Sequence, residues 1–197
     1  MERQPARPGR PRSEASRLAI LAAALDLLAE VGYAGLTIEG IAARSGAGKQ
    51  TIYRWWPSKA DVLLDALTTK AELHIPIPDE GSYPADLRAF LTATFQLGGQ
   101  PRIAGTLRAL MAEAQVNPAF GERFRAEFLS HRRAALRQLV DRAQDRGDLP
   151  PGLSPETVLD LVFGLLWYRL LATDRRFGAE LVDELVHTLA NPGVTHR

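Results

Sequence analysis

Residues Leu36 to Leu63 read LTIEGIAARSGAGKQTIYRWWPSKADVL, and their local signals decide the fold. Thr37 has the side chain of a helix N-cap, and the residues after it predict a short helix over 38–44. The SGAG segment at 45–48 predicts a tight turn, and a second short helix over 49–56 ends at the following proline. Helices this short are not stable alone, so both must pack on their neighbours. The stretch therefore predicts a helix–turn–helix unit.

A longer helix is predicted on each side of this unit. Before it, Ser13 is a candidate N-cap, and Gly32 lies where a C-cap glycine is expected. The apolar stripe between them recurs at three- and four-residue steps and consists of Leu18, Leu21, Ala22, Leu25, Leu28 and Ala29. After the unit, Ser58 is the candidate N-cap of a helix that extends to about His74. Residues 13–75 are therefore predicted to form one helical module.

The rest of the chain has a helical pattern as well. The segment 76–84, PIPDEGSYP, is predicted to be a connecting loop, and residues 85–197 a larger helical body. Their apolar periodicity predicts helices over 86–97, 102–116, 119–146, 155–172 (with Ser154 as N-cap) and 179–190. Strand-like alternation and internal repeats are absent from the sequence. An all-α fold follows.

Charge is distributed unevenly along the chain, although the net charge is only +1. Residues 1–60 carry nine Lys and Arg against five acidic residues, whereas the remainder carries 15 against 18. A basic N-terminal part predicts a polyanionic partner at that end of the protein, with a chance asymmetry as the alternative. The Pro- and Arg-rich tail at 1–12 is predicted to be disordered. Its arginines either contact DNA phosphates or the minor groove, or are simply solvated.

The second short helix has two different faces. At about 100° per residue, Ile52 and Trp56 share one stripe, which is predicted to face the core, and Gln50 and Arg54 lie on the opposite side. Trp55 points about 100° away from Trp56, so the two tryptophans have different roles. The outward face carries Lys49, Gln50, Thr51, Tyr53 and Arg54. These donors suit base edges and phosphates in a major groove, and a merely solvated polar face is the alternative.

Leu36 to Leu63 resembles the helix–turn–helix signature of the TetR family of bacterial transcriptional regulators. The spacing matches from Thr37 through SGAG, TIYRW and SK, and the preceding VGYAGLT fits too. The motif-bearing resemblance covers about residues 13–65, and beyond them it is architectural. It implies a three-helix DNA-binding module followed by a larger helical ligand-binding and dimerisation domain.

The same resemblance implies individual DNA contacts. It assigns phosphate contacts to Thr37, Tyr53 and Lys59, base contacts to Lys49, Gln50 and Thr51, and positions along the groove wall to Arg54 and Trp55. Gly48 departs from the family pattern, because a small hydroxyl residue is common there, which puts one local contact in doubt. Trp55 departs as well, since a polar or basic residue is common there. It either meets thymine methyls or sugars, or packs on a neighbouring helix.

For the body, the resemblance implies a homodimer that reads a near-palindromic operator and responds to a small-molecule effector. The segment VLDLVFGLLWYRLLA (158–172) is apolar on nearly all faces and must be covered on all sides. The predicted dimer interface is Leu161, Leu165, Val182, Leu185 and Val186. The predicted pocket for an apolar or aromatic effector is Phe90, Phe95, Leu107, Met111, Phe124, Phe128, Phe163, Trp167 and Tyr168. Each of these pocket residues could instead be plain core.

Other classes of protein find little support in the sequence. The four His are scattered, Cys is absent, and no G-x-S-x-G or phosphate loop occurs, so no enzyme activity, cofactor or metal site is predicted. No signal peptide is recognisable, and the 158–172 stretch is too short to span a bilayer, so the cytoplasm is the predicted location. The remaining alternative is a helical homodimeric adaptor that keeps the fold without specific DNA binding.

Overall fold

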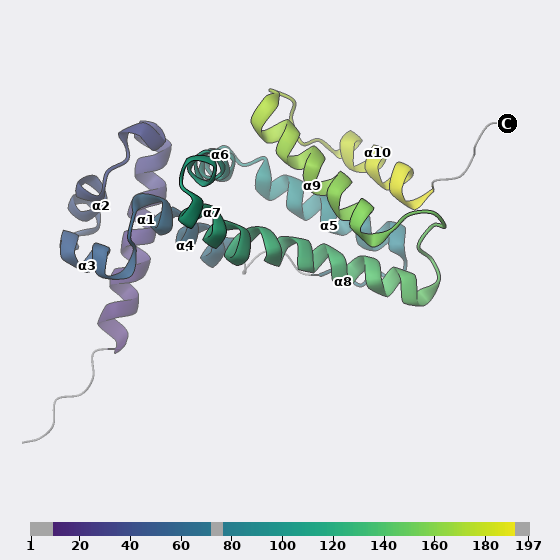
Figure 1. Ribbon diagram of the computed structural model, residues 1–197, viewed down its shortest axis with the longest axis horizontal. Coiled ribbons are helices and arrows are strands. Elements are labelled where there is room, and N and C mark those ends of the chain that lie inside the picture. The colour runs from purple at the N-terminus through teal and green to yellow at the C-terminus, as the bar shows by residue number, and fades with distance from the viewer. Residues whose placement is uncertain (1–9, 72–76, 192–197) are drawn as a thin grey trace, which may run out of the picture. The chain divides into compact units, whose positions relative to one another are not determined.

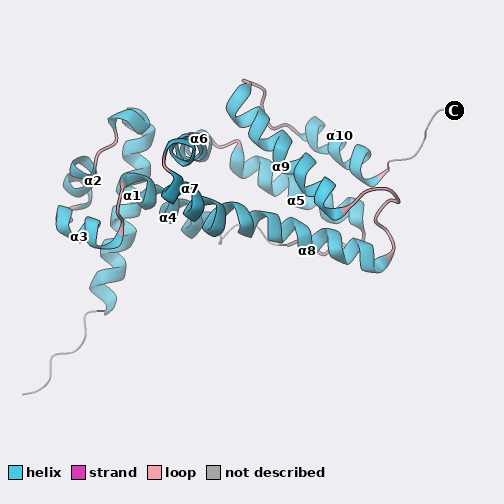
Figure 2. Ribbon diagram, viewed as in Figure 1, coloured by secondary structure: helices cyan, strands magenta, loops and turns pink. Residues whose placement is uncertain are grey.

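The computed structural model describes residues 10–71 and 77–191, and the regular structure within them is entirely helical (Figures 1 and 2). This confirms the all-α fold. The internal contacts divide the chain into two compact units, with the boundary between Leu67 and Thr68. That boundary falls inside a helix, whereas the sequence placed it at the Pro-rich segment 76–84. The predicted N-terminal tail lies outside the described residues up to position 9.

The N-terminal unit is built from the predicted set of helices. They are α1 (Arg10–Gly35), α2 (Ile38–Ser45), α3 (Lys49–Trp55) and α4 (Lys59–Ala71). Helix α1 begins three residues before the predicted start at Ser13, so residues 10–12 are helical and not part of the tail. At Gly32 the backbone leaves the helical region with φ 68°, and the regular part of α1 ends where the sequence places a C-cap.

The turn signals around α2 and α3 act as predicted. The Thr37 hydroxyl accepts a hydrogen bond of 3.0 Å from the Gly40 N–H and caps α2. Helix α2 ends at Gly46, whose left-handed backbone (φ 69°) turns the chain toward α3. Ser58 accepts a hydrogen bond of 3.3 Å from the Asp61 N–H in the first turn of α4. The short helices therefore begin at a capping side chain or a glycine. Helix α2 ends at a glycine, and α3 ends just before Pro57.

A polar joint fixes α3 within the N-terminal unit. Asp65 on α4 accepts a hydrogen bond from Arg17 Nε on α1 (3.1 Å) and one from the indole Nε1 of Trp56 (3.0 Å). The guanidinium of Arg17 also pairs with the second oxygen of Asp65. Trp56 is buried at the end of α3, and Ile52, one turn earlier, is buried completely. The inward stripe predicted for α3 is thus the stripe that packs.

Helix α1 contains a stretch, Glu14–Gly35, that is long and apolar enough to cross a bilayer. In this structure it is the central helix of the N-terminal unit, and the buried positions of that stretch include Ile20, Leu21, Ala24, Leu25 and Leu28. Length and composition alone do not separate a core helix from a membrane span. Burial of its inward stripe and the pairing of Arg17 with Asp65 support the first.

The second unit contains the remaining helices. They are α5 (Tyr83–Gly98), α6 (Pro101–Val116), α7 (Pro118–Phe124), a π-helical turn η1 (Arg125–Leu129), α8 (Ser130–Arg146), α9 (Pro155–Ala172) and α10 (Ala179–Ala190). The single helix predicted over 119–146 corresponds to α7, η1 and α8. Inside it, the Ser130 hydroxyl donates to the Arg125 carbonyl, five residues earlier (2.8 Å). Ser154 caps α9 through the Thr157 N–H (3.2 Å), as predicted.

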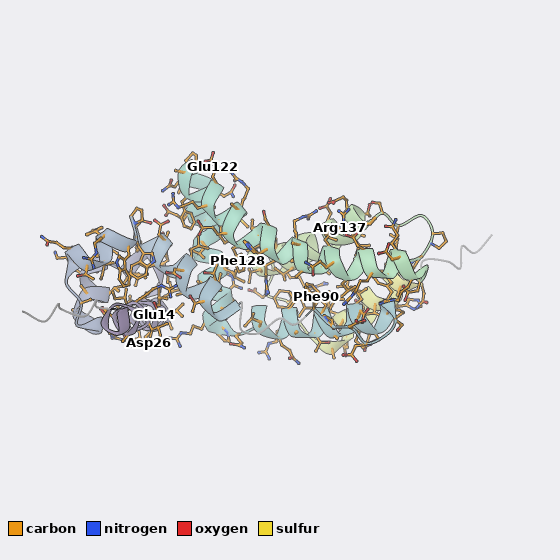
Figure 3. All side chains as sticks on the ribbon, turned by 90° about the horizontal axis from the view of Figure 1, so that it is seen from below. Glu14, Asp26, Phe90, Glu122, Phe128 and Arg137 are labelled. Atoms are coloured by element: carbon orange, nitrogen blue, oxygen red, sulfur yellow. The ribbon has the colours of Figure 1, made fainter. Side chains whose placement is uncertain are left out.

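The core of this unit lies between α5, α8, α9 and α10 and is made of aliphatic and aromatic side chains. Phe90 on α5 belongs to this core, whereas Arg137 lies on the surface of α8 (Figure 3). Phe128 in η1 is buried outside it and stacks on Phe124. One carboxylate is also fully buried. Asp86, near the start of α5, accepts a hydrogen bond of 2.9 Å from Arg146 at the end of α8. This pair ties the start of α5 to the end of α8.

Removal of the Asp65 carboxylate should lower the free energy of unfolding more than removal of an exposed carboxylate of the same unit. Asp65→Ala leaves the buried indole N–H of Trp56 without its acceptor and removes the partner of Arg17. We expect a loss of about 2–4 kcal/mol in the free energy of unfolding, measured by urea denaturation followed by circular dichroism.

The matched control is Glu30→Ala, which breaks the exposed pair between Glu30 and Arg44 (2.5 Å). An exposed pair contributes less than about 1 kcal/mol. Equal losses for the two variants would contradict the role given to Asp65.

Candidate nucleic-acid interface

Helix α3 presents the outward face that the sequence predicts. Its inward stripe is buried, whereas Lys49, Gln50, Tyr53 and Arg54 are exposed and Thr51 is half-buried. Helix α2 packs on α1 and against α3, and the hydrogen bond from Trp56 to Asp65 ties the end of α3 to α4. The exposed face combines two cations, an amide and two hydroxyls on seven residues of helix. A surface of this composition and width can enter a major groove and donate to bases and phosphates.

Trp55 packs on its neighbour and keeps part of its surface open. Its ring meets that of Trp56 edge to face, with centroids 5.3 Å apart and an interplanar angle of 65°. The guanidinium of Arg54 lies 6.0 Å from the centroid of the Trp55 ring. Trp55 itself is half-buried. This ring contact is with the next residue along the chain, and the exposed part of the Trp55 ring is available to a partner.

Lys49, the first residue of α3, forms an ion pair with Glu39 of α2, with 3.1 Å between Nζ and Oε1. Both side chains are exposed, so the pair is weak and readily exchanged for a phosphate. The pKa of Glu39 is lowered by a hydrogen bond from its own backbone N–H and then by Lys49. The carboxylate therefore stays ionised and lowers the positive potential at the start of α3. The sequence analysis did not single out Glu39.

Lys59 has a different set of contacts from the phosphate clamp that the resemblance implies. Its ammonium donates to the backbone carbonyls of Tyr33 (2.8 Å) and Leu36 (2.9 Å), at the end of α1. It also lies 4.3 Å from the centroid of the Tyr33 ring. Two of its three N–H groups are used in this way, and one remains for a phosphate. Its first role in the structure is to tie the start of α4 to the end of α1.

The helix starts at this surface differ in how they are capped. Thr37 is exposed, and its hydroxyl caps α2 as an acceptor, so its own hydrogen remains available to a phosphate oxygen. Gly48, the N-cap of α3, offers no side-chain acceptor to the first N–H groups of that helix. The departure at Gly48 therefore leaves backbone donors of α3 without a side-chain cap.

The predicted effector pocket corresponds mostly to core. Five of its nine residues are buried, namely Phe90, Phe95, Leu107, Phe124 and Phe128, and three are half-buried, namely Met111, Phe163 and Trp167. The rings of Phe124 and Phe128 stack at 5.5 Å, and Trp167 meets Phe124 edge to face at 6.4 Å. Tyr168 is 62% exposed and does not line the interior. Because the helix that carries Tyr168 is apolar on almost all sides, its sequence pattern does not show which way this side chain points.

The body contains a hollow of about 570 Å³ where the ends of α5, α6 and α9 meet. Of the nine predicted pocket residues, Phe95 lines it. The sequence analysis missed its cationic wall, which is formed by Arg108, Arg169, Arg175 and Arg176. These arginines come from three separate segments, and in the sequence only the RR pair at 175–176 gives a visible signal.

Arg132 is a further cation of the body and does not line the hollow. It occupies the inward stripe of α8 between Phe128 and Leu136, and its guanidinium is 5.8 Å from the Phe128 ring centroid. Burial lowers the pKa of Arg132 to about 10. Within the described residues, no carboxylate or carbonyl is at hydrogen-bond distance from it. The sequence analysis did not single it out.

The predicted dimer interface divides into an exposed part and a buried part. Leu161, Gly164, Leu165, Tyr168 and Leu171 follow one face of α9 at three- and four-residue steps, and we call them the α9 stripe. Three of its large side chains are 48–62% exposed.

On α10 the prediction was wrong for Val182 and Val186. Both are only 5% exposed and pack into the core of their own subunit, while Leu185 is half-buried. The apolar face of this amphipathic helix is therefore used within the subunit.

Comparison with known proteins finds a separate match for each of two regions of the chain. Residues 20–66 match the family model described as "Bacterial regulatory proteins, tetR family", and residues 77–189 match "Tetracyclin repressor-like, C-terminal domain". The HTH-type transcriptional regulator YdeS of Bacillus subtilis is 34% identical over 185 residues, which cover 90% of this chain and 89% of that protein. The DNA-binding transcriptional repressor TetR of Mycobacteroides abscessus is 29% identical, covering 92% and 97%. The solved structure of the TetR family transcription regulator SCO0332 superimposes with a TM-score of 0.76 at 30% identity, covering 91% and 98%.

The two tryptophans of α3 should respond differently to substitution. Trp56→Leu empties part of the core and leaves Asp65 with one fewer donor, so we expect a loss of about 3 kcal/mol in the free energy of unfolding. Trp55→Leu removes a half-buried ring and should cost about 1 kcal/mol. Urea denaturation of both variants measures the difference. A larger loss for Trp55→Leu would mean that the roles are reversed.

Proposed function

The chain belongs to the TetR family of DNA-binding transcriptional regulators, and we propose that it is a repressor which binds a near-palindromic operator as a homodimer. We further propose that a small-molecule effector releases it from DNA. The observation that carries the proposal is the face of α3, where an inward stripe anchored by Trp56 leaves Lys49, Gln50, Tyr53 and Arg54 exposed together. Because its proposed target is DNA, we propose that the protein acts in the cytoplasm.

Within this proposal the residues of the interface have separate tasks. Gln50 and Lys49, at the start of α3, approach base edges, and Lys49 exchanges its weak pair with Glu39 for a contact with DNA. Arg54 runs along the groove wall, with Trp55 supporting its guanidinium from one side. Further contacts with phosphate or the groove come from Thr37, Thr51, Tyr53 and the remaining N–H of Lys59.

Selection of bound sequences from random duplex DNA tests the proposal with the whole chain. We expect enrichment of a near-palindrome whose half-sites lie about one helical turn apart, because a two-fold dimer places one α3 in each of two successive major grooves. If no sequence is enriched and binding to DNA shows no dependence on salt, the alternative holds, and the protein is a helical homodimeric adaptor that has kept the fold.

Two substitutions on α3 should weaken DNA binding in distinguishable ways. Gln50→Ala should reduce affinity for the selected operator by about 1–3 kcal/mol and relax the preference at one base pair of each half-site. Arg54→Gln should weaken binding to all sequences and lower the slope of log K against log salt by about one per subunit. Fluorescence anisotropy over a salt series separates the two effects.

The matched control is Arg44→Gln, because the guanidinium of Arg44 is already paired with Glu30. This variant should leave operator affinity within about twofold of the wild type. If Gln50→Ala and Arg44→Gln behave alike, α3 is not the reading helix.

The α9 stripe supports the homodimer. It is an apolar face on a helix that the core of one subunit covers only in part, and Gly164 at its centre meets nothing within 4 Å of where a Cβ would lie. A glycine at that point lets a second helix approach closely. In a dimer with two-fold symmetry, the stripe of one subunit packs on the same stripe of its partner.

Charge placed on the α9 stripe should separate the subunits. Leu161→Glu combined with Leu171→Glu is expected to convert a dimer into a monomer, because four carboxylates would be buried in the interface without partners. Light scattering at micromolar concentration measures the mass. The control is Val116→Glu on α6, a residue that is 78% exposed and lies outside the stripe. A wild-type monomer, or a double variant that stays dimeric, would contradict this interface.

A further inference from the structure

The hollow in the body has an apolar part and a cationic part. Phe95, Ala104, Leu170 and Phe177 supply the apolar part, and the rings of Phe95 and Phe177 lie 5.2 Å apart, tilted by 33°. Every lining residue belongs to the same compact unit. Its volume of about 570 Å³ falls within the usual range for small-molecule sites, about 300–1,000 Å³. The hollow can therefore accept a ligand with an apolar body.

The cationic part of the hollow is lined by four arginines and one acidic residue. Arg108 and Arg169 are fixed there, because Arg108 Nε donates to the Leu170 carbonyl (2.8 Å) and Arg169 Nη1 donates to the Arg176 carbonyl (2.9 Å). These bonds use one N–H of each guanidinium and leave the others open. The side chains of Arg175 and Arg176 have no acceptor within the parts of the chain that the structure describes. Asp174, the lining acid, pairs with none of the four within 4.0 Å.

The arginines of the hollow, which pair with no carboxylate among the described residues, differ from several other arginines of the second unit. Other arginines of the same unit pair with carboxylates, for example Arg88 with Asp183, Arg133 with Glu156 and Asp160, and Arg146 with Asp86. From residue 61 onward, acidic residues outnumber Lys and Arg by 18 to 15. A cluster with three positive charges in excess is therefore not explained by a generally basic surface. It gives the hollow a positive potential that favours an anionic ligand.

Helix α6 adds to the positive potential. Its 16 residues begin at Pro101, which lines the hollow, and its N-cap residue Gln100 makes no side-chain hydrogen bond to the first turn. The N-terminus of a helix carries a partial positive charge and unpaired N–H groups. The fixed arginines, the open arginines and this helix start therefore lie around one hollow whose apolar part is Phe95 and Phe177.

We propose that this hollow binds the effector and that the effector is an amphipathic anion, with a carboxylate or phosphate group on the arginines and an apolar chain or ring against Phe95 and Phe177. The regulatory role of the ligand rests on the proposed function, whereas the binding site does not depend on it. Leu170 and Arg169 belong to the last turn of α9, the helix that carries the α9 stripe. A ligand held there acts directly on the helix that is proposed to join the subunits.

Binding is tested with the full chain and defined probes by titration calorimetry. Decanoate and decyl phosphate carry the two candidate head groups on the same chain, decanol is the neutral match, and acetate and inorganic phosphate are head groups alone. We expect at least one decyl anion to bind about tenfold or more tightly than decanol and than its own head group. The preferred anion identifies the head group. Equal binding of decanol, or no binding of either decyl anion, overturns the proposal.

Arg175→Gln combined with Arg176→Gln locates the site. Both side chains are exposed and make no bond that the fold requires, so the double variant should fold normally and lose about tenfold or more in affinity for the anion. The matched control is Arg133→Gln, a surface arginine of the same unit that lies outside the hollow, and it should bind as the wild type does. If Arg132→Met removes binding and the double variant keeps it, the anion binds beside Phe128 and the hollow is excluded.

A separate measurement distinguishes failure of the site from failure of the regulatory role. Operator affinity is measured by anisotropy with and without the preferred decyl anion at saturation. We expect a fall of about fivefold or more, the usual lower range of coupling between two sites. Anion binding with unchanged operator affinity would overturn the effector role and leave the site standing. No operator binding at all would overturn the proposed function while the calorimetry still decides the site.

Discussion

The position of α3 depends on one carboxylate. Asp65 joins α1 to the end of α3 by accepting from Arg17 and from the indole of Trp56. A seven-residue helix has no stability of its own, so its orientation is whatever its anchors impose. Ile52 and Trp56 turn one side toward the core, and the hydrogen bond to Asp65 fixes the angle at which the helix ends. The outward direction of Gln50 and Arg54 is a consequence of that anchoring.

Cations in this protein fall into two groups that differ in their partners. Arg17 and Lys59 are tied to acceptors inside the N-terminal unit and hold helices together. Within the parts of the chain that the structure describes, Arg54 on α3 and the four arginines of the hollow pair with no carboxylate, although Arg108 and Arg169 donate to backbone carbonyls. A compensated cation contributes to structure, whereas an uncompensated one is available to a ligand. Arg54 therefore marks the face of α3 that is proposed to read DNA, and the arginines of the hollow mark the proposed anion site. Lys49 and Lys59 of the proposed DNA surface have partners within the N-terminal unit.

Much of the fold could be predicted because helix ends depend on local chemistry. Thr37, Ser58 and Ser154 are caps in the structure as in the sequence, and α10 has the predicted bounds. Contacts between distant residues could not be predicted in this way. Periodicity shows that Trp56 faces inward, but not that Asp65 lies opposite its indole, and it gives no sign that Lys59 reaches two carbonyls at the end of α1.

In the second unit, apolar periodicity did not predict the direction of several side chains. Helix α9 is apolar on nearly all sides, so periodicity does not show which way Tyr168 points, and the structure places this side chain on the exposed stripe. Helix α10 is amphipathic, yet its apolar side packs within the subunit, which removes Val182 and Val186 from the predicted interface. The hollow joins residues from α5, α6 and the segment after α9, so only folding brings its charges together.

The most direct test of the central claim uses the three tryptophans of the chain as reporters. Heteronuclear NMR gives one indole N–H signal for each of Trp55, Trp56 and Trp167, assigned through single Trp→Phe variants. On titration with the selected operator, we expect large shifts for the Trp55 indole and for the backbone amides of Lys49 to Arg54. The Trp56 indole should stay bonded to Asp65 and remain slow to exchange with solvent. Unshifted α3 signals, or loss of protection at Trp56 on binding, would contradict the account.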